Sequence, residues 1–91
     1  MRLRWTPDAA EDLYRIVRYI QQNNPTAASR VADALVDGCE RLLRFPRAGR
    51  TGRREGTREF VLTGLPYIVV YRIADEVVEV LRIYHGAQER P

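Results

Sequence analysis

Two amphipathic helical stripes, separated by only a short turn, constrain the fold of this chain more than any other feature. In the first stripe, apolar residues recur at i, i+3, i+4 and i+7, namely Leu13, Ile16, Val17 and Ile20. Thr6 is the predicted N-cap of this helix, and Pro7 suits its first position. The second helix is predicted over residues 25–44, and its stripe comprises Ala28, Val31, Ala32, Leu35, Cys39 and Leu42. Because the turn at 23–25 is so short, the two helices should pack as an antiparallel hairpin.

Four strand-like segments flank this hairpin. Residues 2–5 alternate between arginine and apolar side chains, which is typical of a short strand with one covered face. Segments 58–62, 67–73 and 77–85 are rich in β-branched and aromatic residues, and the middle one is apolar enough to be buried on both faces. The turns between these three segments are short, as between antiparallel neighbours. We therefore predict an α+β fold, β-α-α-β-β-β, with an antiparallel sheet whose one face carries the hairpin. The other face is the natural place for a partner or substrate.

Composition restricts the class of protein and its compartment. With 91 residues, of which 45% are hydrophobic and 30% charged, the chain suits a single domain, 1–91, with one modest core. No apolar run approaches the roughly 18 residues of a membrane span, so no membrane partner is expected. The N-terminal residues lack the apolar region of a secretory signal, and the lone Cys39 suits a reducing compartment. These features predict a cytoplasmic protein.

Positive charge is concentrated in one window, residues 41–58. This window contains one acid, Glu55, and seven arginines: Arg41, Arg44, Arg47, Arg50, Arg53, Arg54 and Arg58. Its net charge is therefore +6, in a chain whose total is +3. Such a local concentration of guanidinium groups predicts an anionic partner, either a phosphate backbone or an acidic peptide. Whether residues 47–57 are ordered stays open at this point.

Six short motifs, in order along the chain, resemble the RelE/ParE superfamily of small toxins from bacterial type II toxin–antitoxin systems. They are W-x-x-x-A-x-x-D-L-x-x-I from Trp5, N-P-x-x-A from Asn24, L-x-x-x-P-x-x-G-R from Leu42, G-T-R-E-F-V from Gly56, P-Y-I-V-V-Y-R from Pro66 and R-I-Y-H-G-A-Q from Arg82. The resemblance covers nearly the whole chain. It implies a toxin from a plasmid-stabilisation or stress module, with a small, acidic, DNA-binding antitoxin as partner and oligomers only through that complex.

The superfamily contains two biochemical groups, and the residues of this chain favour one of them. RelE-like members are ribosome-dependent mRNA endoribonucleases, whereas ParE-like members act on DNA gyrase. Where the RelE-like group usually has an arginine at the start of its third strand, this chain has Ile68, and Phe60 occupies another position that is often basic. No tyrosine or arginine matches the C-terminal catalytic position of that group after His85. The resemblance therefore implies a ParE-like protein that binds gyrase, with a RelE-like nuclease as the alternative.

If the protein is a nuclease, its catalytic residues would be His85, Arg82, Arg72 and Arg58. An imidazole suits proton transfer near neutral pH, but His85 could equally close a strand and hydrogen-bond nearby backbone. Arg72 and Arg82 either hold a phosphate or pair with Glu59 or Glu79 across the sheet. Glu59, a candidate base, is expected instead to pair with Arg58, Arg72 or Arg82.

If the protein acts by binding, its surface for the target and the antitoxin would comprise Arg47, Arg50, Arg53, Arg54, Arg58, Tyr84 and His85. We expect the antitoxin to cover the helix hairpin and the sheet edge, with acidic residues against the arginines. A third possibility is a toxin-derived module that is only a DNA-associated partner.

Four other features receive structural interpretations. Cys39 falls on an apolar stripe and is expected in the core. Tyr67, Tyr71 and Tyr84 either stack on bases or pack within the sheet. Gly38 would allow the first helix to approach closely. One histidine and one cysteine build no closed metal site, and no cofactor motif is present, so neither a metal nor a cofactor is expected.

Overall fold

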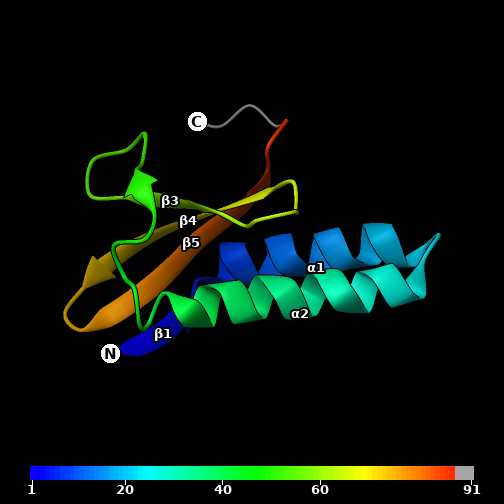
Figure 1. Cartoon of the computed structure of the whole chain (residues 1–91), viewed down its shortest axis with the longest axis horizontal. Helices are drawn as coiled ribbons and strands as arrows, with labels where there is room; N and C mark the ends of the chain where they lie inside the picture. Colours follow the sequence, from blue (N-terminus) through cyan, green and yellow to red (C-terminus); the bar gives the residue numbers. More distant parts are fainter. Residues whose placement is uncertain (88–91) are drawn as a thin grey trace.

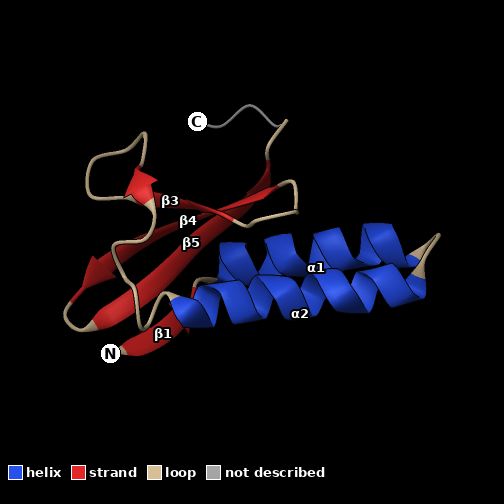
Figure 2. Ribbon diagram, in the orientation of Figure 1, coloured by secondary structure: helices blue, strands red, loops and turns tan. Residues whose placement is uncertain are grey.

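A five-stranded sheet and a two-helix hairpin form the part of the chain that the computed structural model describes, residues 1–87 (Figure 1, Figure 2). The elements are β1 (Arg2–Trp5), α1 (Pro7–Gln21), α2 (Pro25–Arg41), β2 (Arg50–Thr51), β3 (Arg58–Val61), β4 (Tyr67–Ala74) and β5 (Val77–His85). Across the sheet the strand order is β1-β5-β4-β3-β2. The predicted α+β class and the predicted order of elements are confirmed, and β2 is an additional short strand.

The sheet is mixed, whereas the sequence predicted an antiparallel one. β2, β3, β4 and β5 pair antiparallel in turn, as their short connections require. β1, however, lies parallel to β5, with Arg2 opposite Val77 and Trp5 opposite Val80. The prediction was wrong for β1 because residue alternation identifies the two faces of a strand but neither its partner nor its direction. No hairpin turn joins β1 to a neighbour, since the whole helix hairpin follows it.

Both helices begin at side-chain caps that the sequence supplies. The Thr6 hydroxyl accepts a hydrogen bond from the Ala9 amide (3.1 Å), and the Asn24 side-chain oxygen accepts one from the Ala27 amide (3.1 Å). A proline follows each cap. The second helix ends at Arg41, three residues earlier than predicted, and residues 42–44 form turns. The hairpin packs on the sheet and extends past its end (Figure 1).

The pairing register divides the sheet into a face covered by the helices and an open face. Side chains on the covered face form the core with both helices; those from the strands are Val69, Tyr71, Val78, Val80 and Ile83. On β4 the expected burial on both faces holds at Ile68 and Val69 but not at Arg72, which is exposed on the open face. The C-terminal end of β4 is therefore exposed on the open face and not buried on both faces.

Gly38 allows a close approach, but not of the helix that the sequence suggested. A Cβ atom at Gly38 would lie 2.6 Å from Leu62 Cδ2 and 3.7 Å from Phe60 Cε2. The glycine therefore lets α2 approach side chains from the β3 region, and the prediction of contact with α1 was wrong. The helical period placed Gly38 beside a buried stripe without indicating which element faces it.

The start of α1 covers the edge of β5 beyond the end of β1. The Thr6 amide donates to the Val80 carbonyl oxygen (3.0 Å), and the Thr6 hydroxyl donates to that of Leu81 (2.9 Å). Further along, the Ile83 amide donates to Asp12 Oδ2 (2.9 Å). Thr6 and the side chain of Asp12 thus satisfy backbone groups that would otherwise form an exposed strand edge.

Candidate functional site

A buried tyrosine attaches the arginine-rich loop to the sheet. Tyr71 is fully buried on β4; its hydroxyl donates to the Pro46 carbonyl oxygen (2.6 Å) and accepts from the Gly49 amide (2.9 Å). A Cβ atom at Gly49 would lie 2.7 Å from the Tyr71 ring and 2.9 Å from the Glu59 carbonyl oxygen, so glycine is required for this approach. Arg58 adds a third link, because its Nη1 donates to the Gly49 carbonyl oxygen (2.7 Å). The loop therefore follows a defined path, which answers the question that the sequence left open.

This attachment brings β2 alongside β3 and places an arginine over a buried acid. Arg50 lies opposite Glu59 in the register, and its Nη2 is 3.1 Å from Glu59 Oε1. Glu59 is only 5% exposed, so the ion pair compensates for the loss of water around the carboxylate. β2, although only two residues long, orients the start of the loop toward the open face.

Two further buried carboxylates hold arginines on the open side of the sheet. Glu79 binds Arg72 through Oε1 (2.6 Å) and Arg4 through Oε2 (3.3 Å). Asp12 binds Arg82 through two hydrogen bonds, from Nε (2.8 Å) and Nη2 (3.1 Å). The hydrogen bond to Asp12, ahead of the opposing effect of burial, raises the pKa of Arg82 further above its usual value.

The arginines of these ion pairs remain accessible, while their acids do not. The side chains of Arg4, Arg50, Arg72 and Arg82 are 71, 60, 54 and 38% exposed, whereas those of the three acids are at most 9% exposed. A guanidinium has five donors, and each of these arginines uses only part of them on its acid. The open face is thus a surface of oriented arginines whose positive charge is largely balanced by the buried carboxylates beneath them.

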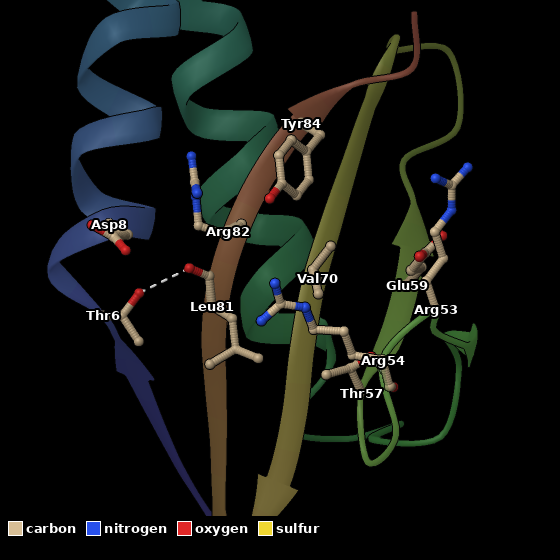
Figure 3. A pocket seen from close by; sticks show the side chains of 10 residues that line it. All are labelled: Thr6, Asp8, Arg53, Arg54, Thr57, Glu59, Val70, Leu81, Arg82 and Tyr84. Carbon is tan, nitrogen blue, oxygen red and sulfur yellow. Dashed lines mark hydrogen bonds between the residues drawn. The ribbon is translucent and has the colours of Figure 1, made fainter. Parts of the chain in front are cut away.

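A pocket of about 300 Å³ lies on the open face between α1, β5 and the arginine-rich loop (Figure 3). Its lining residues are Thr6, Asp8, Arg53, Arg54, Thr57, Glu59, Val70, Leu81, Arg82 and Tyr84. Arg54 reaches from the loop across β4 toward Leu81, so its guanidinium lies over the apolar floor of Val70 and Leu81 (Figure 3). Arg82 lies over the ring of Tyr84, with its guanidinium carbon 5.1 Å from the ring centre.

The structure does not bring the four candidate nuclease residues together. Arg58 lies opposite Tyr71 and is directed at loop carbonyl oxygens. Arg72 pairs with Glu79, which confirms one of the predicted alternatives. Arg82 pairs with Asp12 rather than with Glu59 or Glu79, so that prediction was wrong. Asp12 lies on the buried side of α1 and faces the edge of β5, so its carboxylate reaches Arg82.

His85 ends β5 in the way that its structural interpretation anticipated. Its Nδ1 accepts a hydrogen bond from the Ala87 amide (3.0 Å), and its ring meets that of Tyr67 edge to face at 5.7 Å. The side chain is exposed but is absent from the lining of the pocket that contains Arg82 and Tyr84. A single general acid or base at this position would act apart from the pocket's arginines.

The residues predicted to form a binding surface have different environments. The side chains of Arg47, Arg50, Arg53 and Arg54 are exposed on the loop or β2, whereas Arg58 is half-buried beneath it. Tyr84 is 8% exposed and lies under Arg82. Among the described residues, the pocket therefore unites Arg53, Arg54 and Tyr84 from this set.

Tyr67, Tyr71 and Cys39 pack within the fold. Tyr71 belongs to the core, and Tyr67 is partly buried, which raises the pKa of its hydroxyl. Cys39 is fully buried; burial, with a smaller effect of the Glu40 charge, raises the pKa of its thiol to about 12. Within residues 1–87, no three metal-ligating side chains gather at one point, and neither helix has the length and apolar character of a membrane span.

Sequence reasoning missed Asp12, Arg4 and the hydroxyl of Tyr71. For Asp12 a signal existed, because Ala9, Asp12, Leu13 and Ile16 share the helical spacing of the buried stripe, and an acid there needs a cationic partner. Tyr71 carried no comparable signal, since its partners lie 22 and 25 residues away in a loop.

Comparison with known proteins identifies the class. A solved structure described as the chromosomal ParDE TA system from P. aeruginosa superposes with a TM-score of 0.85 and 27% identity, covering 93% of this chain and 95% of that one. The helix hairpin on a mixed sheet, together with this likeness, defines a small toxin of the RelE/ParE superfamily from a type II toxin–antitoxin system.

Within that class, the chain belongs to the ParE toxin family. The family model for the ParE toxin of the type II toxin-antitoxin system, parDE, matches residues 3–90. The chain is also 41% identical to Y4kP of Sinorhizobium fredii, over 99% of this chain and 93% of that protein. It is 38% identical to Toxin RelE2 of Caulobacter vibrioides, over 92% of this chain and 93% of that protein. The comparisons thus support a cognate antitoxin as partner.

Proposed function

We propose that this chain, acting as one toxin domain over residues 1–91 in the cytoplasm, inhibits growth by binding DNA gyrase. In this proposal it is part of a plasmid-stabilisation or stress module, and its antitoxin neutralises it by binding. The main observation in support is the separation of the arginines that RNA cleavage would need. Arg58 is bound to loop carbonyl oxygens, and Arg72 and Arg82 are bound to buried acids. A binding surface requires no such convergence, because its contacts are spread over a large area.

The proposed contact surface for gyrase is the arginine-rich loop and the adjoining open face. Arg47, Arg50, Arg53 and Arg54 are exposed there. Of the two β5 residues in the proposed surface, His85 is exposed at the end of the strand, whereas Tyr84 is 8% exposed beneath Arg82. Arg58 contributes indirectly in this proposal, since it supports the loop instead of projecting from it. The exposed guanidinium groups would meet acidic or phosphate groups of the gyrase–DNA complex.

A RelE-like nuclease is the second candidate, and the pocket is the observation that favours it. Arg82, Arg54 and Glu59 line one cavity, so two cations and a carboxylate would surround a phosphate that bound there, with Glu59 itself paired with Arg50. Against it stands the pairing of Arg82 with Asp12, which neutralises one cation.

Two parallel assays of the purified chain test the proposal. Gyrase-catalysed supercoiling of relaxed plasmid should be inhibited, while mRNA on translating ribosomes should stay intact. Cleavage of mRNA without an effect on supercoiling would overturn the gyrase proposal and establish the nuclease. If expression of the chain alone did not slow growth, both the gyrase and the nuclease proposals would be overturned. A toxin-derived module that is only a DNA-associated partner would then replace them.

The antitoxin proposal has its own test. The product of the adjacent reading frame, expressed with the tagged chain, should copurify with it and restore growth. A chain that is harmless and remains without a partner would contradict this proposal.

A further inference from the structure

We propose that the pocket between α1, β5 and the arginine-rich loop binds carboxylates, and that its occupant is an acidic segment of the antitoxin. Arg54 would be the principal contact. This inference rests on the proposed function in one respect: it assumes a proteinaceous antitoxin. It goes further by assigning a place, a ligand chemistry and a leading residue to that interaction.

The environment of Arg54 favours an anionic ligand. Its guanidinium lies over Val70 and Leu81 in the pocket, and the residue as a whole is exposed (Figure 3). Within residues 1–87, no carboxylate forms an ion pair with Arg54, in contrast to Arg50, Arg72 and Arg82. A cation above an apolar floor binds an anion more strongly than a fully solvated one does, because the local dielectric constant is lower. Arg54 is therefore a cation placed in a cavity with its donors available.

The rest of the pocket favours a carboxylate over a nucleic-acid backbone. A phosphodiester chain carries one charge per nucleotide and binds best along a row of cations that tracks its backbone. Here Arg82 already binds Asp12, so it does not extend such a row from Arg54. A volume of about 300 Å³ accommodates one or two acidic side chains with an adjoining apolar group. The apolar floor suits the methylene groups of Glu or a neighbouring Leu, which a phosphate backbone does not present.

Hydrogen bonds within the loop fix the backbone at Arg54 before any ligand arrives. The Arg54 carbonyl oxygen accepts from the Thr57 hydroxyl (2.6 Å) and the Thr57 amide (3.1 Å), and the Gly52 amide donates to the Thr57 carbonyl oxygen (2.8 Å). The base of the loop is bound to the sheet through Tyr71 and Arg58. Because the loop backbone is already arranged, binding a carboxylate requires ordering of the Arg54 side chain but not of the loop. Occupation of this pocket would also cover arginines proposed to contact gyrase, which gives a physical basis for neutralisation.

Titration of the full chain with defined probes tests the inference. The probes are the acetylated peptide DELEEL, its neutral counterpart NQLQQL, and the oligonucleotide dT6, each followed by NMR of the isotope-labelled chain. DELEEL should shift the signals of Arg54 Nε, Thr57 and Leu81, and neither NQLQQL nor dT6 should match its affinity. Arg54→Gln should weaken DELEEL binding at least 10-fold, and Arg54→Lys should have an intermediate effect, because lysine keeps the charge but loses the planar pair of donors.

Arg44→Gln is the matched control. It removes the same charge from the same arginine-rich window, but Arg44 belongs neither to the proposed gyrase surface nor to the lining of the pocket, so affinity should change less than about 2-fold. Equal losses for both variants, tighter binding of dT6, or no saturable shift up to about 5 mM DELEEL would each overturn the inference. None of these measurements involves gyrase or growth. A chain that binds DELEEL through Arg54 but leaves gyrase active would therefore refute the proposed target and keep the carboxylate site.

Discussion

Arg82 binds Asp12 through two hydrogen bonds and thereby joins strand β5 to helix α1, where β1 no longer covers the sheet edge. The same carboxylate accepts the Ile83 amide, so one buried acid satisfies a guanidinium and a strand edge together. This relationship explains why an arginine in a candidate catalytic position is part of the framework.

Removing Asp12 should destabilise the protein. Asp12→Ala leaves the buried Ile83 amide without its acceptor and removes the partner of Arg82, which is 38% exposed, so we expect the free energy of unfolding to fall by about 1–3 kcal/mol. Asp8→Ala, an exposed acid in the same turn region, should lower it by at most about 1 kcal/mol. Urea denaturation measures both values.

The double variant Asp12→Ala, Arg82→Met separates the ion pair from simple loss of packing. It should be more stable than Asp12→Ala alone, because no charge is then left without a partner. If the stability losses of Asp12→Ala and Arg82→Met were additive in the double variant, Asp12 and Arg82 would not stabilise the protein as a pair. The proposed link between β5 and α1 would then be wrong.

The hydroxyl of Tyr71 should control the order of the arginine-rich loop. Tyr71→Phe keeps the ring but removes two hydrogen bonds to the loop, so we expect a loss of about 1–3 kcal/mol. Hydrogen exchange at the Gly49 amide should accelerate markedly. Tyr19→Phe, on the exposed side of α1, should change stability by less than about 0.5 kcal/mol. Unchanged protection of the Gly49 amide would show that other contacts hold the loop.

The thiol of Cys39 should be unreactive in the folded protein. Burial raises its pKa from about 9 to about 12, so the folded state favours the neutral thiol. This contribution to stability is fully present below pH about 9 and is lost as the pH rises toward 12. Alkylation by iodoacetamide at pH 8 should be no faster than unfolding allows, whereas a Ser29→Cys variant, at an exposed position, should react rapidly. Rapid alkylation of native Cys39 would contradict its placement in the core.

Substitution of His85 distinguishes binding from catalysis. His85→Ala removes the edge-to-face contact with Tyr67, so we expect a stability loss of about 1 kcal/mol. If the toxin acts by binding, its inhibition of gyrase should fall by less than about 10-fold. A general acid or base would instead lose about 100- to 10,000-fold in activity. A loss of that size in a folded variant would favour the nuclease.

Helix and strand positions could be predicted from the sequence because their signals are local. The spacing of Leu13, Ile16 and Ile20, the caps at Thr6 and Asn24, and the β-branched run from Val77 specify elements through neighbours a few residues apart. The concentration of arginine in 41–58 and the motifs of the family resemblance are likewise features of the sequence alone.

Tertiary structure alone decided the direction of β1, the partner of each arginine and the role of the loop. Asp12 and Arg82 are 70 residues apart, and Tyr71 meets Gly49 across 22 residues. Such pairs depend on strand register and on which helix covers which edge, and residue spacing carries no information about either. The sequence therefore determined that this protein has many arginines beside an open sheet face. Folding determined that most of them are bound to buried acids or loop carbonyl oxygens, and that Arg54 lies over a pocket.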